Sequence, residues 1–175
     1  MNNALINLFS KYRLPFIALT ISALVIVIDR LTEQAVSLYL QDTDGFVKVT
    51  SFFNLVWTGN DGISFGLLQG LTYGKWLLSG FAFLITGFFF IWLLRTQSLW
   101  TACALGLIIG GALGNTFERL AYGHVIDILD FHAYGYHWPA FNLTDSAIVS
   151  GVTLLMFYEL FKAPEHQKIR GTNNG

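Results

Sequence analysis

Four long apolar stretches dominate the pattern of hydrophobic and polar positions along this chain. They cover residues 14–40, 73–94, 99–116 and 141–161. A helix needs about 20 mostly apolar residues to cross a bilayer, and each stretch is close to that length or longer. The stretches lack the alternation of barrel strands, whereas a helix satisfies its own backbone hydrogen bonds in lipid. The pattern therefore predicts a mainly α-helical membrane protein with four transmembrane helices.

The segments between these stretches are more polar, and two of them predict structure outside the bilayer. Residues 47–57 are rich in β-branched and aromatic side chains with partial alternation, which predicts one or two short strands of a small β-sheet. Several aromatic residues of the 41–70 and 122–138 segments suit the membrane interface, where amphipathic rings collect. These aromatic residues are Trp57, Tyr134, Tyr136 and Trp138.

The first apolar stretch has some features of a secretory signal, because Lys11 and Arg13 precede apolar residues 14–28. The stretch ends in the charged pair Asp29-Arg30 and not in a small-residue cleavage site. Three further apolar stretches follow it. We therefore expect it to be retained as the first membrane span.

Composition agrees with a membrane protein. The chain is 54% hydrophobic and only 12% charged, whereas a soluble domain carries about a quarter charged residues. The formal net charge of -1 and the lack of a basic block predict no nucleic-acid partner. The single cysteine, Cys103, excludes a disulfide within the chain and is interpreted as a packing residue. Gly110 and Gly114 form a small-xxx-small pair that allows close helix approach, but the pair alone does not predict a dimer, and we expect a monomer.

Basic residues in the connecting segments predict the orientation of the spans. With four spans both termini share one side, which carries Lys11, Arg13, Arg95, Lys162, Lys168 and Arg170. The other side carries Arg30, Lys48, Lys75 and Arg119. Because basic residues favour cytoplasmic loops, we expect cytoplasmic termini and all aspartates on the outer side. We expect one integral membrane domain over residues 1–163 and a polar, mobile cytoplasmic tail over residues 164–175.

Asp127 and Asp145 are the main candidates for chemistry, because both border apolar residues on the outer side and a carboxylate is costly at the edge of the bilayer. Each has a structural explanation when taken singly: Asp145 can cap the fourth helix, and Arg119 can neutralise Asp127. Two nearby carboxylates in a low-dielectric site cannot both ionise easily, so one keeps a proton at neutral pH. Such a pair can act as general base and general acid, and the sequence does not assign the two roles.

Three amides and one arginine accompany this pair. Asn115 and Arg119 are four residues apart and share a helix face if the third helix continues through them. Arg119 either snorkels to the interface or donates to a substrate carbonyl or lipid phosphate. Asn142 lies three residues before Asp145, where its amide can support that carboxylate. Asn142 and Asn60 are equally compatible with turn or cap positions.

A metal site is not expected. The outer side holds His124, His132 and His137 near Asp127 and Asp130. The sequence contains no His-Glu-x-x-His helix motif, and the spacing of the histidines is unspecific. We expect neither a metal nor another cofactor.

Five spaced blocks of the sequence form a pattern whose order and spacing are more specific than any single block. The blocks are Asp29–Thr32, Asn60–Phe65, Gly110–Arg119, Gly123–Asp127 and Phe141–Ala147. In these blocks the chain resembles the lipoprotein signal peptidases (signal peptidase II), which are bacterial inner-membrane aspartic proteases, and the resemblance extends from Asp29 to about Glu159.

The resemblance implies four transmembrane helices, a small extracytoplasmic sheet and a lid-like segment over the site. It implies a catalytic dyad of Asp127 and Asp145 in the bacterial inner membrane, facing the periplasm. Supporting or substrate-binding roles are implied for Asp29, Asn60, Asn115, Arg119 and Asn142. The implied substrate is a diacylglyceryl-modified prolipoprotein, which is cleaved before its lipidated cysteine in contact with membrane lipid. The family needs no metal and is blocked by globomycin-type cyclic peptides.

The chain departs from the family pattern at three places outside the implied dyad. Glu33 stands where many members have Lys, and Glu118 stands where Asp is usual. Thr58 and Gly59, which precede Asn60, look like a small insertion.

Three other functions are compatible with part of the pattern. A catalytically inactive or divergent paralogue would bind lipoproteins or a cyclic-peptide inhibitor, but it has no need of both Asp127 and Asp145. An ion or proton transporter needs carboxylates at mid-membrane depth, whereas these cluster near helix ends. A metal-dependent intramembrane protease would be inhibited by chelators.

Overall fold

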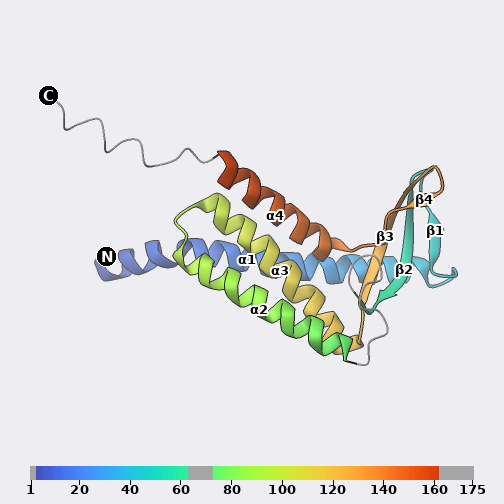
Figure 1. Ribbon diagram of the computed structural model, residues 1–175, viewed down its shortest axis with the longest axis horizontal. Helices are drawn as coiled ribbons and strands as arrows, with labels where there is room; N and C mark the ends of the chain where they lie inside the picture. Colours follow the sequence, from blue (N-terminus) through green and yellow to red (C-terminus); the bar gives the residue numbers. More distant parts are fainter. Residues whose placement is uncertain (1–2, 63–72, 162–175) are drawn as a thin grey trace.

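The computed structural model describes residues 3–62 and 73–161, and it contains four helices and a four-stranded antiparallel sheet (Figure 1). The helices are α1 (Asn3–Leu40), α2 (Gly74–Arg95), α3 (Leu99–Tyr122) and α4 (Leu143–Phe161). The strands are β1 (Phe46–Lys48), β2 (Phe53–Asn60), β3 (Val125–Ala133) and β4 (Tyr136–His137). The predicted fold class is thereby confirmed. The predicted mobile tail lies outside the described residues.

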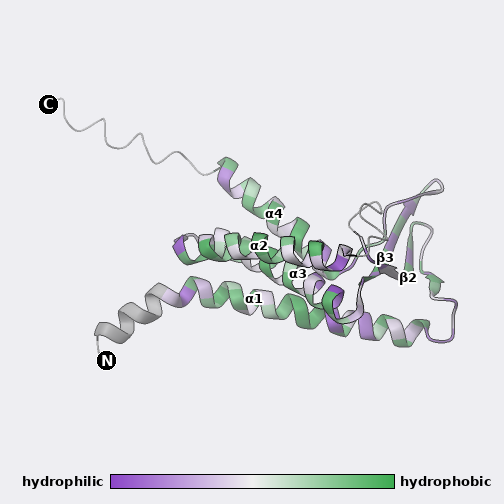
Figure 2. Cartoon of the chain, turned by 60° about the horizontal axis from the view of Figure 1, so that its bottom comes forward, coloured by the Kyte–Doolittle hydropathy of each residue, from purple (hydrophilic) through white to green (hydrophobic). Residues whose placement is uncertain are grey.

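All four helices are long and apolar enough to cross a membrane. The helices are mostly hydrophobic along their length, and polar residues are more frequent toward the sheet (Figure 2). Many of their large apolar side chains are exposed on the protein surface. Helix α3 is central: 61% of its most apolar 18-residue stretch is buried in the protein, whereas the corresponding share in each of the other three helices is only 17–22%. A bundle of this kind buries its shared surface around α3 and leaves the other helices to face lipid.

Glycines on α3 allow its neighbours to approach closely. A Cβ added at Gly106 or Gly110 would lie 2.7 Å from backbone atoms of α1 at Ala18 or Ser22. A Cβ at Gly114 would lie 2.6 Å from Thr144 Cγ2 of α4. The predicted close approach is confirmed, but Gly110 and Gly114 serve two different neighbours and do not form one seam.

Helix α1 is longer than a membrane span. Its 38 residues rise about 57 Å, whereas the hydrocarbon core of a bilayer is about 30 Å thick. At its far end Val36 and Leu40 pack against Ile128 of β3, with Leu55 of β2 at the edge of the cluster. The extra length of α1 therefore provides an apolar support for the sheet.

The sheet has the order β1-β2-β3-β4. The register of β2 against β3 shifts between Leu55 and Thr58, after which Thr58 is opposite Asp127 and Asn60 is opposite Val125. An extra residue of this kind is a β-bulge, which bends a strand and redirects its side chains. The Thr58-Gly59 pair that looks like an insertion in the sequence thus follows an irregularity that aims the end of β2 at Asp127.

Helix α3 continues past residue 116, where the apolar stretch ends. It stops at Tyr122, where the C-cap Gly123 has a φ of 89° and donates its N–H to the Arg119 carbonyl. A positive φ at this position is the usual end of a helix and favours glycine. The additional turns place Asn115 and Arg119 on one continuous helix, as the spacing predicts.

Candidate active site

The two candidate carboxylates come from different kinds of element. Asp127 lies on strand β3, and Asp145 lies in the first turn of α4. Asn142 precedes α4 and accepts the Asp145 backbone N–H on its Oδ1 at 2.8 Å. This is the hydrogen bond of a helix N-cap. Asn142 is thus the cap of α4, and the alternative in which Asp145 is the cap is wrong.

Asp127 is 2% exposed, and one of its oxygens has a defined partner. Asn60 Nδ2 donates to Asp127 Oδ2 at 2.9 Å across the β2–β3 pair. Asp127 Oδ1 is buried and has no hydrogen-bond partner among the described residues. Burial raises the pKa of Asp127 to about 7, with a further upward contribution from the charge of Asp145 and a downward one from the Asn60 hydrogen bond. The carboxyl is therefore balanced between its two protonation states near neutral pH.

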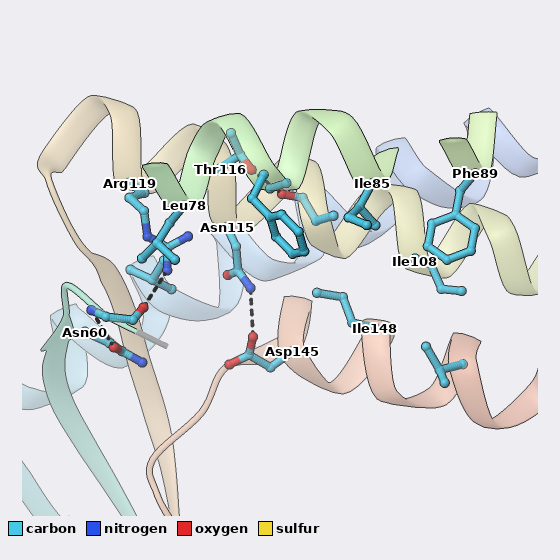
Figure 3. Close-up of a pocket in the computed structure, with 16 residues that line it drawn as sticks. Asn60, Leu78, Ile85, Phe89, Ile108, Asn115, Thr116, Arg119, Asp145 and Ile148 are labelled. Carbon is cyan, nitrogen blue, oxygen red and sulfur yellow. Dashed lines mark hydrogen bonds between the residues drawn. The ribbon is translucent and has the colours of Figure 1, made fainter. Parts of the chain in front are cut away.

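Asp145 is held by an amide of α3. Asn115 Nδ2 donates to Asp145 Oδ1 at 2.7 Å, as Figure 3 shows. The Oδ1 of Asn115 accepts from Asn142 Nδ2 at 3.2 Å. The amide that directly supports Asp145 is therefore Asn115, and the Asn142 side chain acts through it. The predicted support of Asp145 by the Asn142 amide is therefore indirect: its oxygen caps the helix at the Asp145 backbone N–H, and its NH2 group holds Asn115.

Two clefts meet at Asn60 and Asp145. The first, of about 380 Å³, lies between α2, α3 and α4 and is mostly apolar, with Asn115 and Arg119 at its polar end (Figure 3). The second, of about 620 Å³, runs along the start of α4 and the segment 138–141 that leads into it. Asn60 and Asp145 line both clefts. An apolar cleft with a few convergent polar groups is the usual form of a ligand site.

Arg119 lies beside the carboxylates without pairing directly with either. Its NH2 group donates to the Gly62 carbonyl at 3.1 Å, and its Nε has no hydrogen-bond partner among the described residues. Its charge still lowers the pKa of Asp127, although less than burial raises it. In the described part of the chain, direct neutralisation of Asp127 by Arg119 is therefore not observed. The guanidinium is left pointing its polar edge toward the first cleft.

Asp29 does not join the pair. It is 1% exposed, and its Oδ1 accepts the Thr144 backbone N–H at 3.1 Å. Asp29 thus anchors the first turn of α4 to α1, one residue before Asp145. A carboxylate at this place also interacts favourably with the positive end of a helix dipole.

A buried charge cluster adjoins Asp29 and contains both acidic departures from the family pattern. Arg30 lies 2.6 Å from Glu33, 3.5 Å from Asp29, and in direct contact with Glu118. The reversed charge at Glu33 is therefore met by Arg30 from the preceding turn of α1. Glu118 Oε2 also accepts the Ile126 backbone N–H at 3.1 Å, which ties α3 to β3 one residue before Asp127.

His132 and His137 form a separate group on the sheet, whereas the His124 ring lies against Gly59 of β2. His132 and His137 are cross-strand partners, and their rings stack at 4.8 Å. Asn54 donates to Asp130 at 2.7 Å, and His137 Nδ1 lies 2.8 Å from the same carboxylate. Burial alone would raise the pKa of Asp130, but these hydrogen bonds lower it below its usual value. Among the described residues, no three His, Cys, Asp or Glu side chains are grouped so as to hold a metal ion.

The fold and the site define a class: a membrane protein whose helical bundle ends in a small sheet, with a buried carboxylate, Asp127, and a half-buried one, Asp145, where bundle and sheet meet. The family model for signal peptidase (SPase) II matches residues 21–161, and the chain belongs to that family of membrane aspartic peptidases.

Individual relatives agree with this assignment. A protein from Methylocella silvestris named lipoprotein signal peptidase is 42% identical over 149 residues, which cover 82% of this chain and 87% of the relative. One of the same name from Vibrio vulnificus is 40% identical over 125 residues, 70% of this chain and 74% of the relative. A solved bacterial membrane enzyme is 27% identical with a TM-score of 0.66, over 82% of this chain and 87% of its own.

Two residues of the site were not found by sequence reasoning. Glu118 is marked in the sequence only by its departure from the family pattern, although its carboxylate accepts the backbone N–H of Ile126 beside Asp127. Thr144 is one residue of the block that contains Asp145. Its position is the signal in the sequence, since a polar residue in the first turn of a membrane helix, between Asn142 and Asp145, needs a partner.

Proposed function

We propose that this protein is the membrane aspartic endopeptidase that removes the signal peptide from diacylglyceryl-modified prolipoproteins, cleaving before the lipidated cysteine. Family membership supports the reaction class, and the relatives carry the name lipoprotein signal peptidase. The observation that carries the proposal at residue level is that Asp127 and Asp145 lie close enough for the charge of Asp145 to raise the pKa of Asp127. Each carboxylate also has its own amide donor, Asn60 or Asn115, and both amides line the first cleft.

The pair has the chemistry that peptide hydrolysis requires. With one proton shared between Asp127 and Asp145, the ionised carboxylate takes a proton from the attacking water as general base. The protonated carboxyl donates to the substrate carbonyl oxygen as the water oxygen bonds to the carbonyl carbon. When this intermediate collapses, the C–N bond breaks, the proton gained from water passes to the departing amine, and a hydroxyl proton of the intermediate returns to the pair. The elevated pKa of Asp127 permits such sharing near neutral pH. The pair titrates as a unit, so the two roles belong to the pair.

The substrate class follows from the walls of the first cleft. Leu78, Phe81, Ile85 and Phe89 of α2 line it opposite Ile148 of α4, so it offers an apolar surface that begins at Asp145. Acyl chains of a lipidated cysteine would lie along this surface while the peptide bond reaches the carboxylates. Each methylene that is buried contributes about 0.8 kcal/mol, so two chains supply substantial binding energy.

Arg119 is proposed to receive the polar part of the substrate. Its guanidinium lines the first cleft, and its Nε has no partner among the described residues. A planar guanidinium is suited to carbonyl and ester oxygens, which accept hydrogen bonds from its fixed fork. Asn60, Asn115 and Asn142 are proposed to support the two carboxylates, and Asp29 to support the start of α4.

We further propose that the protein acts as a monomer in the bacterial inner membrane, with both termini in the cytoplasm and the sheet on the periplasmic side. The distribution of basic residues supports this orientation. Reporter fusions after Arg95 and after Tyr122 would test it, since the first position should report cytoplasm and the second periplasm.

The proposed reaction is tested with purified protein in detergent and with two forms of one prolipoprotein, with and without the diacylglyceryl group, in the presence of a chelator. We expect cleavage of the lipidated form only, with mass spectrometry placing the new N-terminus at the lipidated cysteine. Equal cleavage of both forms would contradict the role of the apolar cleft. Lack of cleavage by folded wild-type protein would instead favour an inactive binding paralogue.

A further inference from the structure

Thr144 lies at the centre of the polar network behind the two carboxylates. It is fully buried, at 0% exposure, in the first turn of α4 between the cap residue Asn142 and Asp145. Its backbone N–H donates to Asp29 Oδ1 at 3.1 Å. One residue therefore joins α1 to α4 directly beside a proposed catalytic group.

The hydroxyl of Thr144 lies between two amide oxygens. Its Oγ1 is 2.6 Å from Asn115 Oδ1 and 2.7 Å from Asn142 Oδ1. A hydroxyl carries one proton, so this proton is shared between the two acceptors. Both distances lie within the ordinary range for hydrogen bonds between oxygens, so the Thr144 hydroxyl is in contact with both amide oxygens.

The position of Asn115 depends on this contact. Its Oδ1 has one other donor, Asn142 Nδ2 at 3.2 Å, and that amide also lies 3.3 Å from the Ile126 carbonyl. The Thr144 hydroxyl is thus the nearer of the two groups that hold the oxygen of Asn115. With the oxygen held there, the NH2 group of Asn115 is directed at Asp145 Oδ1, 2.7 Å away.

Packing leaves little freedom for Thr144 itself. Its methyl group faces Gly114 of α3, where an added Cβ would come within 2.6 Å of Thr144 Cγ2. Gly111 faces the backbone of the same residue. Because α3 has no side chain at these two positions, the first turn of α4 sits against α3 and the hydroxyl is fixed by its surroundings.

We propose that Thr144 is a positioning residue for peptide cleavage: its hydroxyl holds the amide of Asn115 in the orientation that donates to Asp145. The proposal rests on the proposed function, since it assigns Asp145 to the reaction. It predicts that the hydroxyl, and not merely the volume of the side chain, sets the rate of the chemical step. Thr144 does not touch the substrate in this role.

Three substitutions separate the hydroxyl from the methyl group. Thr144→Ser keeps the hydroxyl, Thr144→Ala removes both groups, and Thr144→Val keeps the volume without the hydroxyl. We expect kcat of Thr144→Ser within about twofold of wild type and a loss of about five- to tenfold for Thr144→Ala, the worth of one neutral hydrogen bond. KM should change little, because the hydroxyl does not meet the substrate.

A double-mutant cycle with Asn115→Ala distinguishes positioning from general support. If Thr144 acts through Asn115, then Thr144→Ala should cost nothing further in the Asn115→Ala background. A residue that only stabilises the fold would lower the rate by the same factor in both backgrounds. Asn115→Ala alone is expected to lower kcat about ten- to hundredfold, the usual effect of losing a hydrogen bond to a charged group.

Each outcome of these measurements decides the proposal. Full kcat in folded Thr144→Ala or Thr144→Val would overturn it. So would an equal loss of kcat on Thr144→Ala in the wild-type and Asn115→Ala backgrounds. If both variants fail to fold while Thr144→Ser folds, the hydroxyl serves stability and the positioning role is wrong. Failure of the wild-type protein to cleave in the same assay would count against the proposed function instead.

Discussion

The hydrogen bond from Asn60 to Asp127 makes a sharp prediction about pH dependence. Asn60 Nδ2 lies 2.9 Å from Asp127 Oδ2, and this bond partly offsets the upward effect of burial, so that the pKa of Asp127 is about 7 with the bond in place. Asn60→Leu removes the donor, keeps most of the volume and limits entry of water. Since the donor stabilises the ionised carboxylate, its loss should raise the pKa of Asp127 further.

The size of the effect follows from the energy of the bond. A hydrogen bond to a charged group is worth about 1.5–3 kcal/mol, and one pH unit corresponds to about 1.36 kcal/mol. We therefore expect the pKa of Asp127 to rise by about one to two units in Asn60→Leu. Because the pair needs one proton, activity is lost when the last proton leaves, so the alkaline limb of the profile should move upward by the same amount.

The assay is the pH profile of kcat/KM between about pH 5 and 10 for a lipidated peptide substrate in detergent. Asn54→Leu is a matched control, because Asn54 is a buried asparagine of the same strand that donates to Asp130 at 2.7 Å. Wild type and Asn54→Leu should lose activity above about pH 7, and Asn60→Leu at higher pH. An unchanged alkaline limb in Asn60→Leu, or an equal shift in Asn54→Leu, would refute the reasoning.

Three further predictions concern stability, measured as thermal unfolding in detergent. Burial raises the pKa of Asp127 in the folded protein to about 7, above that of an aspartate in the unfolded chain. Its contribution to stability is therefore complete below about pH 4 and is lost as pH rises through 7, and Asp127→Asn should flatten that decline. Gly111→Ala should lower the free energy of unfolding by about 1–3 kcal/mol, because the added methyl group overpacks against α4. Gly80→Ala should be tolerated, because open space surrounds that position. Equal unfolding temperatures for the two variants would contradict this packing. Arg30→Gln should lower the free energy of unfolding by up to about 3 kcal/mol, because three carboxylates lose their cation. Adding Glu33→Gln should restore part of that stability. No loss of stability in Arg30→Gln would contradict the importance of the cluster.

The membrane spans could be predicted because hydrophobicity over about 20 residues is a strong signal. The element that carries Asp127 could not. Strand β3 is buried on both faces near Asp127, with Val125, Asp127 and Ile128 all buried, so its sequence lacks the alternation that marks a half-buried strand. Its neighbour β2 alternates only in part, because a register shift interrupts it.

The candidate residues could be named from the sequence, but their partners could not. Asn142 as a cap and Asn115 as the donor to Asp145 depend on how closely α3 and α4 approach, and Gly111 and Gly114 permit that approach. The direction in which Arg119 points depends on the segment just after β2, where the Gly62 carbonyl accepts its hydrogen bond. Contacts between distant segments of this kind follow from packing and not from local pattern.

The most direct test of the central claim compares three aspartate variants in one cleavage assay with a diacylglyceryl-modified prolipoprotein. Asp127→Asn and Asp145→Asn remove the proposed pair one member at a time, and Asp130→Asn is a matched control on strand β3 outside it. We predict that both pair variants fold and lose turnover by at least about a thousandfold, while Asp130→Asn keeps most of the wild-type rate. Wild-type turnover in folded Asp127→Asn or Asp145→Asn would contradict the account.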